Sequence, residues 1–307
     1  MNQIFQALLH PSFWKSFVIS IIFLALEACA LYFDFQVFGL VLFVLFPIAL
    51  GIAIGYMSKR RWAYYGLTMG IVTFLVFLVT SSLEGIICVL MSLPLAIPLI
   101  LLGVAIRGYL EDQGILKPKD DFVAFITPLI FIFIAGSVEK HYFTNVPKLD
   151  KVETERIYPF PPEQVFDAVK SMDTVVARKQ LLMYLDLPIP RKCVLDSAEI
   201  GGIRTCYFSG GTITEKITEI EKGKVLRMDV ISFNLMVSKW LGFQEAIYYF
   251  ESVDGNSCRM TRITTYTSAL SPRFYWRPLE KVGIKEEHEY VFDGVQHKLE
   301  HHLEINK

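Results

Sequence analysis

The first half of this 307-residue chain has very little charge. Residues 1–145 contain 8 Lys and Arg and 8 Asp and Glu, which leaves 22 of the 30 basic and 23 of the 31 acidic residues for the rest of the chain. Neither half has an excess of positive charge, which excludes a basic surface for nucleic acid. With 53% hydrophobic residues, the chain is more apolar than an ordinary soluble protein. We therefore expect a membrane region over residues 1–145 and a separate water-soluble domain over residues 146–307.

The chain also lacks the common signatures of nucleotide binding and hydrolase catalysis. It has no P-loop, no dinucleotide-binding glycine motif and no Gly-x-Ser-x-Gly sequence. Its five cysteines form no Cys-x-x-Cys pair, and the three in the C-terminal half leave one unpaired, so no disulfide framework can be inferred. His297 and His301 have the spacing of a metal-binding pair on a helix, but a solvated helix face is the favoured interpretation. We expect no metal and no cofactor.

Five apolar stretches in the N-terminal half have lengths suited to crossing a bilayer. They are residues 13–33, 37–57, 63–82, 85–106 and 122–138. Four reach the ~20 residues that the hydrocarbon core requires, and the last is near the lower limit of ~17. Only a hydrogen-bonded helix crosses lipid without unsatisfied backbone groups, so all five are predicted to be helices. The pattern indicates an integral, multi-pass protein of the cell or inner membrane, with a helical bundle that serves mainly as an anchor.

Positive charges on the short loops predict the orientation of these helices. With five spans, one side carries Lys15, Lys59, Arg60, Arg61, Arg107, Lys117 and Lys119. The opposite turns, around Asp34 and Glu84, carry no Lys or Arg. The positive-inside rule then makes the N-terminus cytoplasmic, and an odd number of spans places the C-terminal domain outside the cytoplasm. If residues 122–138 are only interfacial, the domain is cytoplasmic instead.

Two acidic residues lie in or beside the apolar stretches. Glu27 is within the first stretch and Glu84 opens the fourth. A charge at the bilayer centre costs about 2.5–3.5 kcal/mol, so we expect Glu27 to face protein or to be protonated. The two carboxyl groups are candidates for an intramembrane proton or ligand site. The favoured alternative is a hydrogen bond to a neighbouring helix, or a position close enough to the interface to stay hydrated.

The C-terminal half has the pattern of an α+β domain. Residues 151–158 alternate as a strand, and Pro161-Pro162 then starts a short helix, with more helix expected over residues 172–185. Asp254-Gly255-Asn256 is a strong hairpin signal. An apolar stripe at three- and four-residue steps predicts a long helix over residues 284–303. The strands predicted between the helices are residues 192–195, 203–208, 212–220, 225–231, 246–253 and 259–267.

Several motifs in this half resemble one family. The start of the first helix, Pro-Pro-Glu-Gln-Val-Phe-Asp-Ala-Val at 161–169, is followed by Gly201-Gly202-Ile203-Arg204, by Phe208 and Gly211, and by Thr214-Glu215-Lys216-Ile217. With Thr265-Tyr266 and the terminal amphipathic helix, this order resembles the START-like SRPBCC superfamily, which includes polyketide cyclases and lipid-transfer domains. The resemblance covers about half of the chain and implies a helix-grip fold. We therefore expect a membrane α-helical bundle plus an α+β domain in which a curved antiparallel sheet surrounds a long C-terminal helix.

The resemblance also implies an apolar cavity between the sheet and the terminal helix. Candidate cavity residues on the predicted strands and helix are Arg204, Glu215, Ile217, Tyr266, His288, Val291, Phe292 and Val295. Glu215 and His288 are the candidates for holding a polar head group. The alternative is that His288 is a satisfied core histidine and that Glu215 pairs with Arg204. The aromatic run 274–276 could border the cavity mouth, but loop packing or an interfacial anchor is the favoured interpretation.

The leading functional hypothesis is membrane-tethered binding or transfer of a lipid or another hydrophobic small molecule. The partners expected are the lipid bilayer and that ligand, without nucleic acid, and the sequence identifies no protein partner. One alternative is an enzyme of the polyketide cyclase/dehydrase type with Glu215 or His288 as general acid or base. Another is a non-catalytic membrane sensor or assembly protein.

Overall fold

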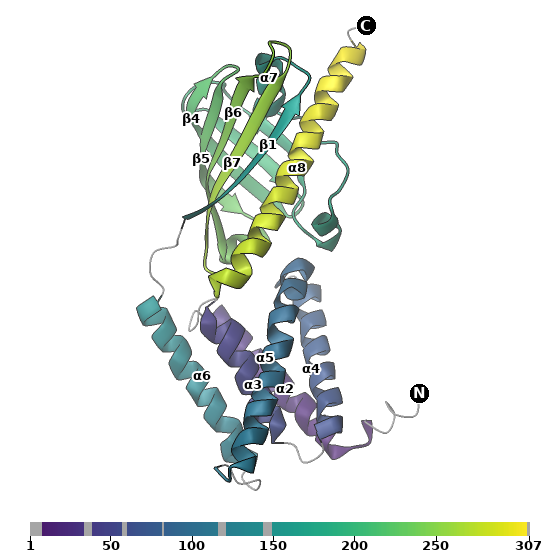
Figure 1. Cartoon of the computed structure of the whole chain (residues 1–307), viewed down its shortest axis with the longest axis vertical. Coiled ribbons are helices and arrows are strands. Elements are labelled where there is room, and N and C mark those ends of the chain that lie inside the picture. Colours follow the sequence, from purple (N-terminus) through teal and green to yellow (C-terminus); the bar gives the residue numbers. More distant parts are fainter. Residues whose placement is uncertain are drawn as a thin grey trace. The chain divides into compact units, whose positions relative to one another are not determined.

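The computed structural model describes residues 8–33, 39–56, 60–81, 83–115, 121–143 and 149–305. They fall into two units, one built of helices and one built of a sheet and helices (Figure 1). The expected boundary between residues 145 and 146 lies outside the described residues and stays a prediction.

Long apolar helices build the N-terminal unit. Over the described residues, three segments are long and apolar enough to cross a membrane: Pro11–Ala30, Arg61–Thr80 and Ile86–Asp112. They belong to α2 (Pro11–Tyr32), α4 (Arg60–Thr80) and α5 (Ile86–Asp112). The predicted stretch 37–57 contains a shorter helix, the π-helical η1 (Val41–Leu45) continued by α3 (Phe46–Gly55), and its two ends lie outside the described residues. The last predicted stretch is within α6 (Asp121–Phe143).

Glycines let these helices pack at short range in two pairs, α2 with α4 and α3 with α5. A Cβ atom on Gly51 of α3 would lie 2.0 Å from the carbonyl oxygen of Ile100 in α5. A Cβ atom on Gly66 of α4 would lie 2.2 Å from the carbonyl oxygen of Phe13 in α2. Gly51 and Gly66 each begin a Gly-x-x-x-Gly sequence, the spacing that allows close helix contact in membranes, where the hydrophobic effect does not drive helices together.

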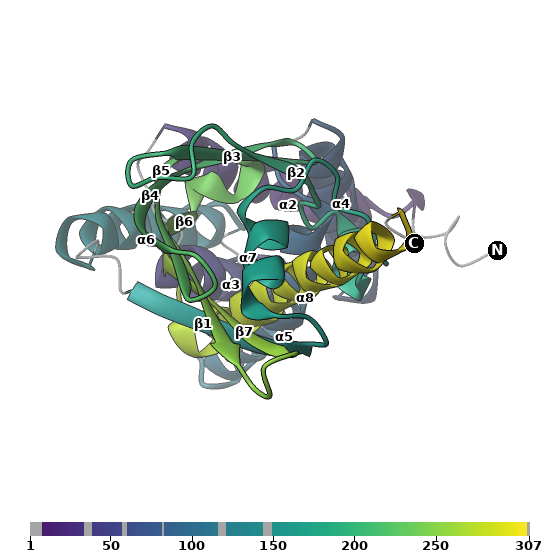
Figure 2. The ribbon, with the colours of Figure 1, turned by 90° about the horizontal axis from the view of Figure 1, so that it is seen from above.

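The C-terminal unit has one antiparallel sheet of seven strands in the order β1-β7-β6-β5-β4-β3-β2. Its helices are α7 (Pro162–Lys170), the 3₁₀ turns η2 (Leu181–Leu185) and η3 (Met236–Lys239), and α8 (Arg273–Ile305). Figure 2 shows the strands in an arc around α7 and α8. This is the expected helix-grip fold. The strands are β1 Leu149–Tyr158, β2 Pro190–Leu195, β3 Ile203–Phe208, β4 Gly211–Glu221, β5 Val225–Asn234, β6 Leu241–Ser252 and β7 Cys258–Ser268.

All predicted strands are confirmed, but two predictions about helices are wrong in extent. Of the helix expected over residues 172–185, only the turn η2 forms, because the backbone before it pairs with β2 instead. Met172 exchanges two backbone hydrogen bonds with Cys193, and the Val175 N–H donates to the Arg191 carbonyl at 2.7 Å. Helix α8 begins at Arg273, well before residue 284. Its first turns lie before the predicted apolar stripe; there Trp276 is buried, and Ser268 donates to Glu280 at 2.6 Å.

Two apolar clusters fill the space between the sheet and α8. The larger cluster joins α7 and the second half of α8 to the sheet, with Val165, Phe166, Met260 and Phe292 among its buried members. The smaller cluster consists of Val152, Leu241, Tyr266 and Ile284. The candidate site lies between these two clusters.

Candidate functional site

A layer of buried polar side chains separates the two apolar clusters. Along β7, Arg262 and Thr264 lie between Met260 of the larger cluster and Tyr266 of the smaller one. Along α8, His288 lies in the same way between Ile284 and Val291. We call this set the polar layer; its members are Thr154, Arg204, Glu215, Tyr248, Arg262, Thr264, Glu287 and His288, of which only Glu287 is partly exposed.

His288 is held between two strands. Its Nδ1 atom lies 2.7 Å from the Thr154 hydroxyl, and its Nε2 atom lies 2.8 Å from the Thr264 hydroxyl. Burial, together with the positive charge of Arg262, lowers the pKa of His288 well below its ordinary value. The ring is therefore neutral at physiological pH, and both nitrogens have hydroxyl partners. Its expected role toward a ligand stays a prediction.

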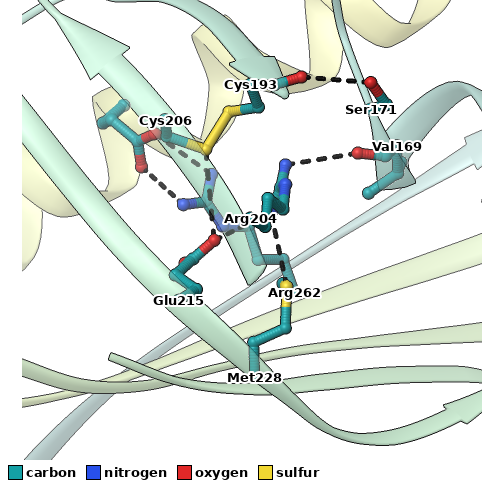
Figure 3. Close-up of a disulfide and its surroundings, with 9 residues drawn as sticks. Val169, Ser171, Cys193, Arg204, Cys206, Glu215, Met228 and Arg262 are labelled. Carbon is teal, nitrogen blue, oxygen red and sulfur yellow. Dashed lines mark hydrogen bonds and ion pairs between the residues drawn. A yellow bond between two sulfur atoms is a disulfide. The ribbon is translucent and has the colours of Figure 1, made fainter. Parts of the chain in front are cut away.

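Arg204 and Glu215 form a buried ion pair across β3 and β4, where they are direct cross-strand neighbours (Figure 3). An Arg204 NH1 atom donates to a Glu215 carboxylate oxygen at 3.1 Å. An Arg204 NH2 atom donates to the carbonyl oxygen of Val169, the penultimate residue of α7, at 3.2 Å. These contacts connect the sheet to α7 through one guanidinium group.

A second ion pair in the polar layer was not predicted from the sequence. Arg262 of β7 lies 2.9 Å from Glu287 of α8. The Tyr248 ring lies between the two pairs, with its centroid 5.8 Å from the Arg204 Cζ atom and 5.4 Å from the Arg262 Cζ atom. Burial raises the pKa of the Glu287 carboxyl, although the charge of Arg262 opposes this effect. The strand alternation that places Arg262 on the same face as Tyr266 is the signal that could have identified it.

The remaining candidate residues lie in the two apolar clusters. The structure places Ile217, Val291, Phe292 and Val295 in the larger cluster, all of them buried. Tyr266 lies in the smaller cluster, and its hydroxyl donates to Glu280 at 3.3 Å. The structure therefore brings Arg204 and Glu215 together, while Tyr266 and His288 have other partners.

A set of partly exposed apolar side chains continues the concave face beyond the polar layer. Val230 is the cross-strand partner of Glu215, Phe233 is the partner of Ile213, and Phe243 is the partner of Tyr266, so each shares a face with a buried residue. The rings of Phe233 and Phe243 are in edge contact, with centroids 5.0 Å apart. Phe208 has the same strand phase as Arg204. We call Phe208, Val230, Phe233 and Phe243 the apolar lining.

A disulfide between Cys193 and Cys206 joins β2 to β3 (Figure 3). The sequence did not indicate this pairing, because it depends on the strand register that places the two residues opposite each other. Their Cα atoms are 4.0 Å apart. Cys258 is a buried free thiol, and burial raises its pKa to about 11. This thiol is therefore a poor nucleophile while the domain is folded.

The charged residues of the helical unit are only partly where the sequence placed them. Glu27 is buried on α2, with 4% of its surface exposed, and Glu84 lies half-buried in the bend before α5. Arg107 was expected on a loop; it is instead buried within α5, stacked at 4.0 Å on the Tyr56 ring. An ion pair with Glu111 at 3.4 Å also stabilises it there. The expected loop charges Asp34, Lys59, Lys117 and Lys119 lie outside the described residues.

Comparisons with known proteins find similarity in structure only. No family model matches the sequence, and no curated protein sequence is similar to it. The Zhui aromatase/cyclase from Streptomcyes sp. R1128 is 12% identical, with a TM-score of 0.37 over 51% of this chain and 96% of that one. A protein of unknown function, SA2116 from Staphylococcus aureus, is 15% identical, with a TM-score of 0.38 over 52% and 98%. Norcoclaurine synthase from Thalictrum flavumn is 12% identical, with a TM-score of 0.36 over 52% and 99%. Similarity this low identifies neither a ligand nor a reaction for this chain.

Proposed function

We propose that this chain is a membrane-anchored protein whose C-terminal unit binds a hydrophobic small molecule with a polar end. The observation that carries the proposal is the position of the apolar lining beside the polar layer on one concave face. Apolar surface that stays partly exposed next to buried donors and acceptors suits a molecule with an apolar body and a polar group. Burial of such a body contributes about 25 cal/mol per Å², so micromolar affinity needs few specific contacts.

In this proposal the sequence candidates have two roles. Arg204, Glu215, Tyr266 and His288 set the orientation of the polar end, while Ile217, Val291, Phe292 and Val295 form the closed apolar floor beyond it. Arg262, Glu287 and Tyr248 belong with the first group because they are in the same layer. The geometry gives less support to general acid or base catalysis, because Glu215 is ion-paired and both ring nitrogens of His288 have hydroxyl partners.

We further infer that the helical unit crosses the membrane several times, with a cytoplasmic N-terminus and the C-terminal unit on the opposite side. The three long apolar helices and the close glycine contacts support membrane insertion. The disulfide supports the orientation, because disulfides persist in oxidising compartments and are rare in the cytosol. Labelling of an Ile200→Cys variant by a membrane-impermeant maleimide in sealed right-side-out vesicles tests it, since Ile200 is exposed in the turn after β2. Labelling only after the vesicles are opened would contradict the orientation.

Ligand binding is tested by native mass spectrometry of the full chain after incubation with a membrane lipid extract. Val230→Trp fills the apolar lining and is expected to remove a bound hydrophobic mass that the unchanged protein retains. Ile231→Trp is the matched control, because Ile231 is the adjacent residue of β5, lies at a β-bulge and is exposed. Identical bound masses in both variants and the unchanged protein would contradict binding at this site.

A further inference from the structure

One end of the sheet in the C-terminal unit exposes apolar side chains on several separate segments. At this end β1 and β6 begin while β5 and β7 end. Leu149 is the first residue of β1, Met236 is in the connection between β5 and β6, and Phe274, which is 81% exposed, is in the first turn of α8. The turn η2 adds Leu181 and Tyr184, and it is held against the first half of α8, where Glu286 accepts a hydrogen bond from the Leu182 N–H at 2.8 Å. We call Leu149, Leu181, Tyr184, Met236 and Phe274 the apolar rim.

Basic residues flank the segments of this rim. Arg178 and Lys179 precede η2, separated from it by Gln180, and the Lys179 Nζ atom lies 5.9 Å from the centroid of the Tyr184 ring. Lys239 follows Met236 in η3, and Arg273 directly precedes Phe274. Apolar and aromatic side chains beside Lys and Arg are typical of surfaces that sit among lipid head groups.

The opposite end of the sheet has exposed apolar side chains but a different charge. Ile200 and Val253 are exposed in its turns. The same turns carry four acidic residues, Asp196, Glu199, Glu221 and Asp254, and two basic ones, Lys222 and Lys224. An anionic lipid surface repels such an end and attracts the end with the rim. Charge therefore distinguishes the two ends where apolar exposure alone does not.

Chain connectivity favours the same end. Helix α6 ends at Phe143 and β1 begins at Leu149. Six residues of fully extended chain span at most about 21 Å. The first residue of the rim therefore cannot be farther than this from the end of an apolar helix that we assign to the membrane.

We propose that the apolar rim lies in the head-group layer of the membrane that holds the helical unit, on a surface containing anionic lipid. Phe274, Met236 and Tyr184 enter the interfacial layer, and Arg178 and Lys179, both exposed, face the phosphate groups. Phe208, Phe233 and Phe243 of the apolar lining lie close to the strand ends on this side of the sheet, so they are then next to the bilayer and a membrane-dissolved ligand reaches them without crossing bulk water. The proposal rests on the membrane insertion proposed above and does not require that a ligand binds.

Site-specific crosslinking of the full chain tests this contact. Phe274→p-benzoylphenylalanine puts a photoreactive aromatic group on the rim, and Val253→p-benzoylphenylalanine puts it on an exposed position at the acidic end. Both variants are reconstituted in vesicles of phosphatidylcholine and phosphatidylglycerol, irradiated and analysed by peptide mass spectrometry. We expect a lipid adduct at position 274 in several-fold higher yield than at 253. The yield should fall in phosphatidylcholine alone and in the Arg178→Gln, Lys179→Gln double variant.

The outcomes separate this proposal from the others. Equal lipid yields at the two positions, or no lipid adduct at position 274 in protein that resists carbonate extraction, would overturn it. A protein crosslink in place of a lipid at position 274 would overturn it in favour of a protein partner. Release of the chain by carbonate would refute membrane insertion and this proposal together. Absence of a bound mass in the native spectrum refutes ligand binding alone.

Discussion

Replacing Arg204 with Met should strongly destabilise the C-terminal unit, because it leaves the Glu215 carboxylate buried without its partner. Removing one member of a buried ion pair typically costs 3–5 kcal/mol. Replacing both members, Arg204→Met with Glu215→Leu, removes both charges and leaves only the Val169 carbonyl short of one donor. The lost hydrogen bond costs about 1 kcal/mol. The double variant no longer has to desolvate two charges, and this gain offsets the loss. We therefore expect the double variant to be about as stable as the unchanged protein.

The thiol of Cys258 reports this stability within the full chain. It is fully buried on β7, so a maleimide labels it only when the sheet opens. Pulse labelling across a urea series, read from the mass of the peptide that contains Cys258, gives the midpoint of unfolding. With an m-value of about 2 kcal/mol/M, a loss of about 4 kcal/mol lowers the midpoint by about 2 M. Arg227→Met is the control, because Arg227 pairs with Glu219 and Glu245 in a partly exposed position, where such pairs contribute about 0–1 kcal/mol.

Two results would refute this reasoning. If Arg204→Met lowers the midpoint no more than Arg227→Met does, the pair is not desolvated and the polar layer does not exist as described. If the double variant is as unstable as Arg204→Met alone, the loss comes from the packing of Arg204 and its bond to α7 rather than from a stranded charge.

Three further predictions concern other parts of the chain. The folded pKa of His288 lies below the unfolded value of about 6.5, so acidification favours the unfolded state. The free energy of unfolding should therefore fall by up to about 1.4 kcal/mol per pH unit below 6.5. Acidification should lower the urea midpoint less in His288→Gln than in the unchanged protein, and equal falls would count against a buried neutral ring. Replacing Cys193 and Cys206 by Ala should lower the free energy of unfolding by about 3 kcal/mol, since the disulfide closes a loop with a sequence separation of 13. A reducing agent should lower the urea midpoint of the unchanged protein but not that of the variant. Gly51→Leu should lower the temperature of unfolding in detergent because its Cβ would lie 2.0 Å from a backbone carbonyl of α5, whereas Met69→Leu on an exposed face should have little effect; equal values would argue against this helix contact.

The elements of the C-terminal unit follow from local sequence patterns. Alternation of apolar and polar residues, together with glycines at turns, placed the strands to within a few residues of their observed ends, except that β6 begins at Leu241 rather than residue 246. The helix predicted over residues 172–185 was wrong because a tertiary contact decides the backbone conformation there. Met172 pairs with Cys193, which is distant in the sequence, and this tertiary contact overrides the local preference for a helix.

The candidate site was only partly predictable for a related reason. Glu215 and His288 could be selected because strand phase and the helix stripe indicate that they face inward, whereas the facing of Arg204 could not be predicted. Arg262 and Glu287 have the same facing but occupy different elements, so neither one by itself indicates an ion pair. Thr154 and Thr264 become partners of His288 only when β1 and β7 are adjacent.

The sequence by itself determined the apolar helices and the order of strands and helices, because these depend on the hydropathy and backbone preferences of neighbouring residues. The helix-grip arrangement was expected from the resemblance of motifs such as Gly201-Gly202-Ile203-Arg204 to a known superfamily. The tertiary structure decided which side chains meet. The Cys193–Cys206 disulfide, the Arg262–Glu287 pair and the charge difference between the two ends of the sheet all depend on strand register and on the rotation of α8. Register and rotation are set by packing between residues far apart in the chain, and local sequence carries no record of those distances.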